Sequence, residues 1–138
     1  MKFIFIGAGY CSEFVIPLLP KNCKIIGIHK SLPPKLRYKK FEYVQRFDFE
    51  SFLRNKKNIL RGTTHVLVSI PPDEDGDRVI NKIYDELTRL SSLKWIGYFS
   101  TTGVYGNHSG NWVDEKSKLK TQNIRSINRI KAEKQYLD

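Results

Sequence analysis

The fold is decided by residues 2–12, which read KFIFIGAGYCS. Residues 2–6 are mostly apolar and β-favouring on both faces, a pattern typical of a strand buried inside a parallel sheet. Gly7 and Gly9 then supply a turn, because glycine adopts backbone conformations that other residues avoid. A helix is expected over residues 10–19, with Pro17 bending it or ending it early. The stretch predicts a strand, a glycine turn and a helix in immediate succession.

The rest of the chain alternates short apolar runs with polar, helix-like stretches, which is typical of βαβ units. Further strands are expected over residues 24–28, 41–46, 64–70 and 94–99. Helices are expected over residues 49–58, 77–90 and 121–137, the last with Thr121 as its N-cap, and a basic loop over residues 30–40. The predicted fold class is α/β: a doubly wound parallel Rossmann-type sheet of about five strands, with right-handed crossovers, in one domain over residues 1–138.

The glycine turn has the spacing of a dinucleotide-binding loop, G-x-G-x-x-S. Gly7 permits the tight turn, Gly9 lets the backbone approach a pyrophosphate, and Ser12 stands where a small residue lets the helix pack on the strand. The pyrophosphate would lie at the start of the helix, beside Tyr10 and Cys11. The alternative is a glycine-rich turn without a ligand.

The choice of cofactor depends on the end of the second strand. An acidic residue about 20 positions beyond the glycines would bind the adenosine ribose hydroxyls of NAD. This chain instead has His29, Lys30 and Ser31 there. A cation and a hydroxyl suit a 2′-phosphate, so NADP is favoured over NAD; the alternative is that Lys30 merely begins the basic surface loop.

Composition excludes several classes of protein. The chain has 138 residues, 40% of them hydrophobic, and no apolar run of the ~18–20 residues that a membrane span needs. Cys11 and Cys23 are too few for a disulfide framework or a metal cluster, and the three histidines do not group with them. We therefore expect a cytoplasmic protein with reduced cysteines, no metal site and no membrane partner.

The net charge of +10 is unevenly distributed, since residues 21–61 carry twelve basic and three acidic side chains. Aromatic residues lie between these cations and would stack on bases in a nucleic-acid-binding module; they are Tyr38, Phe41, Tyr43, Phe47 and Phe52. The competing interpretation is that the aromatics belong to the core and that the lysines are ordinary solvated surface. Nucleic acid is the less favoured partner.

Three stretches together resemble a known family. They are GAGY at 7–10, THVLVSIPP at 64–72 and FSTTGVYG at 99–106. Their pattern resembles the extended short-chain dehydrogenase/reductase superfamily, the NAD(P)-dependent epimerase/dehydratase group, in an atypical branch suggested by the two prolines and by NWVDE at 111–115. The resemblance covers residues 2 to about 137 and implies an NAD(P)-binding oxidoreductase or epimerase.

The resemblance also implies roles for particular residues. Thr101 matches the family's catalytic Ser/Thr, which hydrogen-bonds the substrate oxygen, although a hydroxyl there also suits the capping of a turn. Asp48 matches the acidic residue that contacts the adenine. The segment Ser69, Ile70 and Pro71 matches the one that runs along the cofactor riboses.

The chain departs from the family on the last helix. The family has a proton-donating Tyr there and a Lys four residues later, whereas this sequence has Arg125 and Arg129 at those positions. Arginine does not deprotonate in proteins, so Arg125 cannot serve as a general acid or base. Arg129 retains the charge needed to hold a ribose. The standard hydride-transfer mechanism is therefore not encoded.

The chain also stops where extended members of the family continue. We expect a Rossmann domain truncated before the C-terminal substrate domain, with one sheet edge uncovered. Such a chain would be a non-catalytic remnant, or a subunit whose edge is covered by a second chain or by a homodimer formed through Ile124, Ile127 and Ile130. The substrate is an unidentified small molecule.

Overall fold

The sheet and its helices are seen in a computed structural model, which describes residues 1–31 and 41–137. Within these residues, five parallel strands form one sheet in the order β3-β2-β1-β4-β5. The strands are β1 (Lys2–Ile6), β2 (Lys24–His29), β3 (Gln45–Asp48), β4 (His65–Val68) and β5 (Trp95–Tyr98). The helices are α1 (Tyr10–Val15), η1 (Ile16–Leu18), α2 (Phe49–Arg54), α3 (Lys56–Leu60), α4 (Ile80–Thr88), η3 (Thr102–Tyr105) and α5 (Ile124–Leu137). The predicted α/β fold with a parallel, doubly wound sheet is confirmed.

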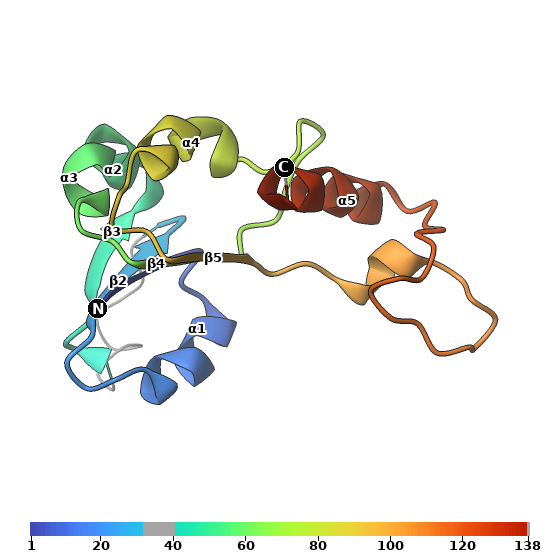
Figure 1. The fold of residues 1–138 in the computed structure, drawn as a ribbon, viewed down its shortest axis with the longest axis horizontal. Helices are drawn as coiled ribbons and strands as arrows, with labels where there is room; N and C mark the ends of the chain where they lie inside the picture. Colours follow the sequence, from blue (N-terminus) through green and yellow to red (C-terminus); the bar gives the residue numbers. More distant parts are fainter. Residues whose placement is uncertain (32–40, 138) are drawn as a thin grey trace.

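Alternating side chains of each strand build two separate cores, one on each face of the sheet. On one face, Phe5 and Ile25 pack with residues of α1, η1 and the turn that precedes β3. On the other, Ile4 and Val66 pack with α2, α3 and α4. Figure 1 shows α1 on one side of the sheet and α2, α3, α4 and α5 on the other. The sheet is thus covered on both faces, as a buried parallel sheet requires.

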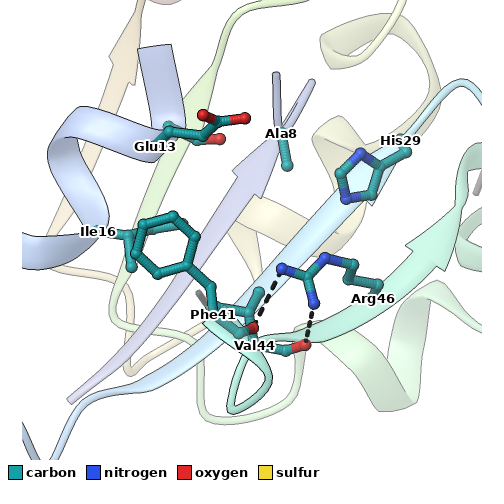
Figure 2. Close-up of a pocket in the computed structure, with 8 residues that line it drawn as sticks. Ala8, Glu13, Ile16, His29, Phe41, Val44 and Arg46 are labelled. Atoms are coloured by element: carbon teal, nitrogen blue, oxygen red, sulfur yellow. Dashed lines mark hydrogen bonds between the residues drawn. The ribbon is translucent and has the colours of Figure 1, made fainter. Parts of the chain in front are cut away.

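The third strand begins later than expected. Residues 41–46 were predicted as a strand, but β3 comprises Gln45–Asp48, and Phe41 and Val44 lie in a turn whose side chains are buried in the core. The Arg46 guanidinium holds this turn by donating to the carbonyls of Phe41 (3.1 Å) and Val44 (3.0 Å), as Figure 2 shows. The expected basic loop over residues 30–40 lies, from residue 32 on, outside the described residues.

Two of the predicted helices are also altered. The helix expected over residues 49–58 is divided into α2 and α3 at Asn55, whose backbone (φ −122°, ψ 24°) leaves the helical region. The helix expected over 77–90 is confirmed as α4 but is shorter, because Asp77 Oδ1 accepts hydrogen bonds from the amides of Val79 (2.7 Å) and Ile80 (2.8 Å) and so caps its start. Ile83 and Leu87 are buried, as the apolar stripe predicted.

The last helix, α5, is present, but its N-cap was predicted wrongly. Asn123, rather than Thr121, caps it by accepting from the amides of Arg125 (2.9 Å) and Ser126 (3.4 Å). The buried residues are the small Ser126 and Ala132, whereas the isoleucine stripe lies outside the core, with Ile124 65% exposed. Small side chains let the backbone of α5 lie close to the neighbouring elements. The inward face of α5 is therefore the one that carries small residues, and not the one that carries the isoleucine stripe.

None of the helices in the described part of the chain is both long and apolar enough to span a bilayer.

Candidate functional site

The predicted site residues come from the carboxyl ends of the strands. Because all five strands are parallel, these ends lie along one edge of the sheet. The glycine turn follows β1, His29 ends β2, Asp48 ends β3, Ser69 follows β4, and Phe99 follows β5. The topology therefore brings the expected cofactor-binding segments to one edge, with β1 at the centre and β4 beside it.

The first glycine of the turn is fixed by its backbone. Gly7 has φ +97°, a conformation that residues with a side chain rarely adopt. Its amide and that of Ala8 both donate to the Ile28 carbonyl, at 2.9 and 2.8 Å, and its own carbonyl accepts from Ser69 Oγ at 2.6 Å. A Cβ on Gly7 would lie 2.7 Å from Ser69 Oγ. The turn is thus tied to both neighbouring strands, and only glycine fits at its first position.

The second glycine meets the opposite condition. A Cβ built on Gly9 has Gly7 O, at 3.9 Å, as its single neighbour within 4 Å among the described atoms, so the outer side of this backbone is open. Ser12 is buried, and its Oγ donates to the Gly9 carbonyl at 2.6 Å, which secures the start of α1. Tyr10 and Cys11 are exposed beside this opening. The turn offers an uncovered stretch of backbone of the kind that a pyrophosphate needs.

The ends of β2 and β3 lie next to each other, since His29 and Asp48 are partners in the sheet register. His29 is 7% exposed, and burial together with the nearby Arg46 guanidinium lowers its pKa. Asp48 is half-buried and caps α2, accepting from the Ser51 amide at 2.8 Å; hydrogen bonding from Ser51 lowers the pKa of this carboxyl. Lys30 and Ser31 are exposed immediately beyond. A carboxylate thus does stand near the end of β2, but β3 supplies it.

A small cavity borders the predicted site, since Ser12 and His29 are among the residues that line it. This cavity, drawn in Figure 2 between α1 and the strands β2 and β3, is also lined by Arg46 and Glu13 and has a volume of about 10 Å³, room for no more than one water molecule. A larger hollow of about 230 Å³ is lined by Pro17, Cys23 and Tyr43 and lies near the opposite edge of the sheet.

The end of β4 contributes the segment that was expected to follow the riboses. The Ser69 amide continues the ladder by donating to Ile6 O at 2.9 Å, and its hydroxyl is used by Gly7. Ile70 is half-buried against the main core, and Pro71 is exposed. Since Ser69 contacts the glycine turn directly, the two predicted cofactor segments are in contact.

The end of β5 holds the two candidate catalytic residues. Thr101 is exposed, and its Oγ1 accepts from the Gly103 amide at 3.2 Å, capping η3 and leaving its own hydrogen to donate. Arg129 donates to Tyr98 Oη at 3.1 Å and to the Phe99 carbonyl, and its guanidinium lies 5.6 Å from the centre of the Tyr98 ring. Arg125 is exposed at the first turn of α5. Arg129 is thus already engaged by the two residues that precede Ser100.

Behind these residues lies a buried polar group that sequence reasoning missed. Asp77 is 0% exposed, and burial raises the pKa of its carboxyl. Burial and the charge of Asp77 also raise the pKa of Tyr136, whose ring stacks on that of Tyr98 with centres 5.0 Å apart. Tyr136 is therefore unsuited to exchange a proton near neutral pH. It does not replace the tyrosine that the family pattern would have at residue 125.

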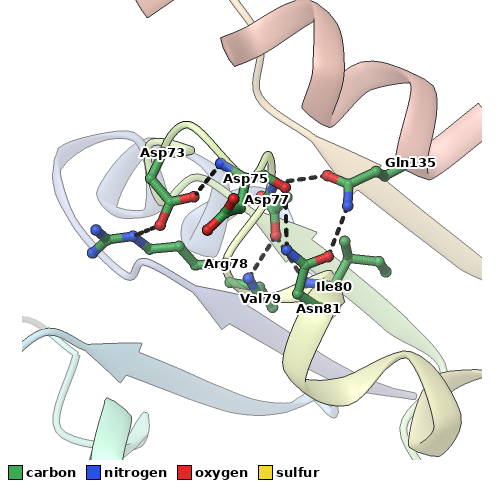
Figure 3. A network of polar contacts seen from close by, with 8 residues as sticks. All are labelled: Asp73, Asp75, Asp77, Arg78, Val79, Ile80, Asn81 and Gln135. Atoms are coloured by element: carbon green, nitrogen blue, oxygen red, sulfur yellow. Dashed lines mark hydrogen bonds and ion pairs between the residues drawn. The ribbon is translucent and has the colours of Figure 1, made fainter.

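Figure 3 shows how α5 holds the segment that contains Asp77. Gln135 Oε1 accepts from the Asp77 amide at 2.7 Å, and Gln135 Nε2 donates to Asn81 Oδ1 at 2.7 Å. Lys131 Nζ donates to the Glu74 carbonyl at 2.8 Å. The spacing of 131 and 135, one turn apart on a helix, was the signal available in the sequence, but nothing local indicated their partners.

The described residues bear on the metal and nucleic-acid predictions, and among them Tyr43, one of the aromatics of the basic segment, is 63% exposed. They contain no group of three or more His, Cys, Asp or Glu side chains that would hold a metal ion. Both cysteines are free, and burial raises the pKa of the Cys23 thiol. Phe41 and Phe52 are buried in the two cores and are unavailable to stack on bases, while Tyr38 lies outside the described residues.

Comparison with known proteins supports the fold. No family model and no curated protein sequence matches the chain. Among solved structures, the chain is similar to a conserved protein of unknown function from Silicibacter pomeroyi, with 31% identity and a TM-score of 0.81 over 98% of this chain and 48% of that one. It is also similar to UDP-glucuronic acid 4-epimerase from Bacillus cereus in complex with NAD, with 18% identity and a TM-score of 0.77 over 99% of this chain and 51% of that one.

A third similar structure is MoeE5 in complex with UDP-glucose and NAD, at 15% identity and a TM-score of 0.65, over 99% of this chain and 48% of that one. The chain thus spans about half the length of each of these three proteins. The UDP-glucuronic acid 4-epimerase and MoeE5 structures both contain NAD. Because their sequence identity to this chain is low, the comparison with them shows a similar fold and nothing more. The five-stranded parallel sheet of this chain is that of a Rossmann-type fold.

Proposed function

We propose that this chain is the NAD(P)-binding domain of an oxidoreductase- or epimerase-like protein. The observation that carries the proposal is the contrast between the two glycines of the turn. Gly7 is locked to β2 and β4, while the backbone at Gly9 faces open space at the carboxyl edge of the sheet. A rigid turn with one uncovered stretch of backbone is what a dinucleotide pyrophosphate requires. The likeness to NAD complexes of similar fold supports the same proposal.

In this proposal the cofactor follows the carboxyl edge from β3 to β5. Gly7, Gly9, Tyr10, Cys11 and Ser12 hold the pyrophosphate. His29, Lys30 and Ser31 contact the adenosine ribose, with Asp48 beside the adenine. The segment Ser69, Ile70 and Pro71 follows the riboses. Thr101 and Arg129 lie at the nicotinamide end. This path follows the order of the strands in the sheet.

We propose NADP as the preferred form. Lys30 is exposed at the end of β2, where a cation suits a 2′-phosphate, and Arg46 adds a second positive charge behind it. Asp48, which is placed beside the adenine, would favour NAD only if it bound the ribose hydroxyls instead. Its engagement with the Ser51 amide turns part of the Asp48 carboxylate toward α2, and this supports the preference for NADP.

Catalysis is proposed to require more than these 138 residues. The bound dinucleotide would supply hydride chemistry, and Thr101 would donate a hydrogen bond to a substrate oxygen. Arg125 cannot exchange a proton, so no residue at that position of α5 serves as acid or base. The reaction would then need an acid or base from outside residues 1–138. A nucleotide sugar is the first substrate class to test, given the ligands of the two NAD complexes.

The alternative, a remnant or partner subunit that no longer binds a cofactor, predicts a different outcome in one experiment. Calorimetric titration of the monodisperse protein with NADPH and, separately, with NADH should give saturable binding, tighter for NADPH by about tenfold, which is 1.4 kcal/mol. Equal affinities would remove the preference for NADP. Absence of binding by folded protein would leave the remnant as the better account. The cytoplasmic location that we propose is checked by fractionation.

The matched variant for this titration is Gly9→Ala. Gly9 lies outside the left-handed region (φ −112°, ψ −149°), and the added methyl group meets no described atom closer than 3.9 Å, so the fold should survive. The same methyl group would stand where the pyrophosphate approaches, and binding should fall at least tenfold. Ser91→Ala, an exposed position beyond α4, is the control and should bind as the parent does.

A further inference from the structure

Two side chains of α5 hold two successive residues at the end of β5. Arg129 donates to the Phe99 carbonyl, and the Ser100 hydroxyl donates to the Glu133 carboxylate. Residues 129 and 133 are four positions apart and so project from the same face of the helix. The residue that comes next in the chain is Thr101, the candidate for contact with substrate. The helix therefore fixes the path of the chain immediately before that hydroxyl.

The residues before and after Ser100 are each held against α5 by contacts that do not involve Glu133. Arg129 is itself braced, because it donates to Tyr98 Oη and lies over the Tyr98 ring. After Thr101, Gly103 approaches α5 so closely that a Cβ there would lie 2.8 Å from Ser126 Oγ. Ser100 is an exposed residue between these two anchored points, and its hydroxyl donates to Glu133. Removal of Glu133 would release the residue nearest to Thr101 while leaving the anchors on both sides.

We propose that Glu133 is a positioning residue for the nicotinamide end of the site, acting through Ser100 to fix the Thr101 hydroxyl. This inference rests on the proposed dinucleotide function. It assigns Glu133 no contact with cofactor or substrate. Its carboxylate accepts the Ser100 hydroxyl hydrogen, and hydrogen bonds to a charged group are stronger than those between neutral groups. The segment 99–101 is thereby held in one conformation before a ligand arrives, which avoids the loss of affinity that ordering it on binding would cause.

The test compares a whole cofactor with the same cofactor lacking nicotinamide. NADPH and 2′-phospho-ADP-ribose share the adenosine, ribose and pyrophosphate contacts at residues 7–12, 29–31 and 48. Only NADPH carries the nicotinamide ring, which this proposal places beside residues 99–101. Glu133→Ala should weaken NADPH binding on the order of fivefold to tenfold, while the affinity for 2′-phospho-ADP-ribose changes less than about twofold. A loss caused by general destabilisation would reduce both affinities together.

Three further variants show whether Glu133 acts through Ser100. Glu133→Gln keeps an oxygen that accepts the same hydrogen bond and should restore most of the NADPH affinity. Ser100→Ala should reproduce the loss seen in Glu133→Ala. The double variant should be no worse than either single one, because both remove the same interaction. Glu115→Ala, which removes an exposed carboxylate elsewhere, is the control for charge and should bind both ligands normally.

The outcomes separate this inference from the function on which it rests. If the parent protein binds neither ligand, the proposed function is wrong and the inference falls with it. If the parent binds both and Glu133→Ala leaves the ratio of their affinities unchanged, the inference alone is wrong. Should Glu133→Ala fail to fold, Ser100→Ala and Glu133→Gln carry the test, and normal NADPH binding by Ser100→Ala would overturn it.

Discussion

The glycine turn after β1 and the β5–α5 end of the same sheet edge are held in place by different means. At the glycine turn, the Gly7 and Ala8 amides share one carbonyl of β2, and the Gly7 carbonyl accepts from the Ser69 hydroxyl just after β4. At the other end, side chains of α5 reach the chain at Glu74, Asp77, Phe99 and Ser100. A backbone-held turn depends on a conformation that other residues cannot adopt. A side-chain-held segment depends on hydrogen-bonding groups, and a conservative substitution can preserve those.

The largest effect is expected at the turn. Gly7→Ala would force a Cβ to within 2.7 Å of Ser69 Oγ in a backbone with φ +97°. We expect it to lower the free energy of unfolding by about 3 kcal/mol, through strain and displacement of the end of β4. Urea denaturation checks this, with Gly9→Ala as the glycine control that should change stability by less than about 0.5 kcal/mol. Equal losses for the two would show that the turn is not locked at Gly7.

A smaller loss is expected where a side chain does the holding. Asp77→Ala removes the cap that the amides of Val79 and Ile80 use, and should lower the free energy of unfolding by about 2 kcal/mol. Asp77→Asn keeps an accepting oxygen and should retain most of the stability. Thermal or urea unfolding of the two variants measures the difference. An asparagine variant as unstable as the alanine variant would contradict the distinction between the two ends of the edge.

The same residue gives a prediction for pH. Burial raises the pKa of Asp77 above its usual 3.8, so the folded state holds this proton more tightly than the unfolded state does. The contribution of this group to stability therefore falls as the pH rises from about 4 through the folded-state pKa, and is constant above it. Unfolding curves between pH 4 and 8 should show a component of this sign in the parent that is absent in Asp77→Asn. A parallel profile for the two proteins would show that Asp77 is not the group responsible.

The smallest effect is expected on the outer face of α5. Ile124 is 65% exposed, so Ile124→Ala should change the free energy of unfolding by less than about 0.5 kcal/mol, whereas the fully buried Ile83→Ala on α4 should cost about 3 kcal/mol. If the isoleucine stripe forms a homodimer interface, Ile124→Ala should instead weaken association, which light scattering across a range of concentrations would detect. A monomeric parent would exclude this interface.

The parts of the fold that were predictable from sequence depend on local constraints. The strand, turn and helix of residues 2–18 follow from apolar runs, two glycines and one proline in a row. The error at β3 arose because Phe41 and Val44 look like strand residues, although they reach the core from a turn that Arg46 holds. On α5 the sequence did not indicate the inward face, because the buried residues are the small Ser126 and Ala132.

In the candidate site too, the locally determined part was predictable from the sequence and the long-range contacts were not. The glycine turn could be found because its spacing carries the conformational requirement. The contacts of Asp77 with Gln135 and of Ser100 with Glu133 join residues 58 and 33 positions apart, and no sequence period links them. The sequence also predicted the end of β2 without a carboxylate, since only the register of β2 with β3 brings Asp48 beside His29.

The central claim is that a dinucleotide binds along the carboxyl edge of the sheet, starting from the glycine turn. The most direct measurement is an amide-resolved NMR titration of the labelled protein with NADPH. The account predicts saturable shifts at residues 7–12, 29–31, 69–70 and 99–101, with residues 21–24 and 61–64 at the opposite edge unaffected. Shifts confined to that opposite edge, or none at all at millimolar NADPH, would contradict it.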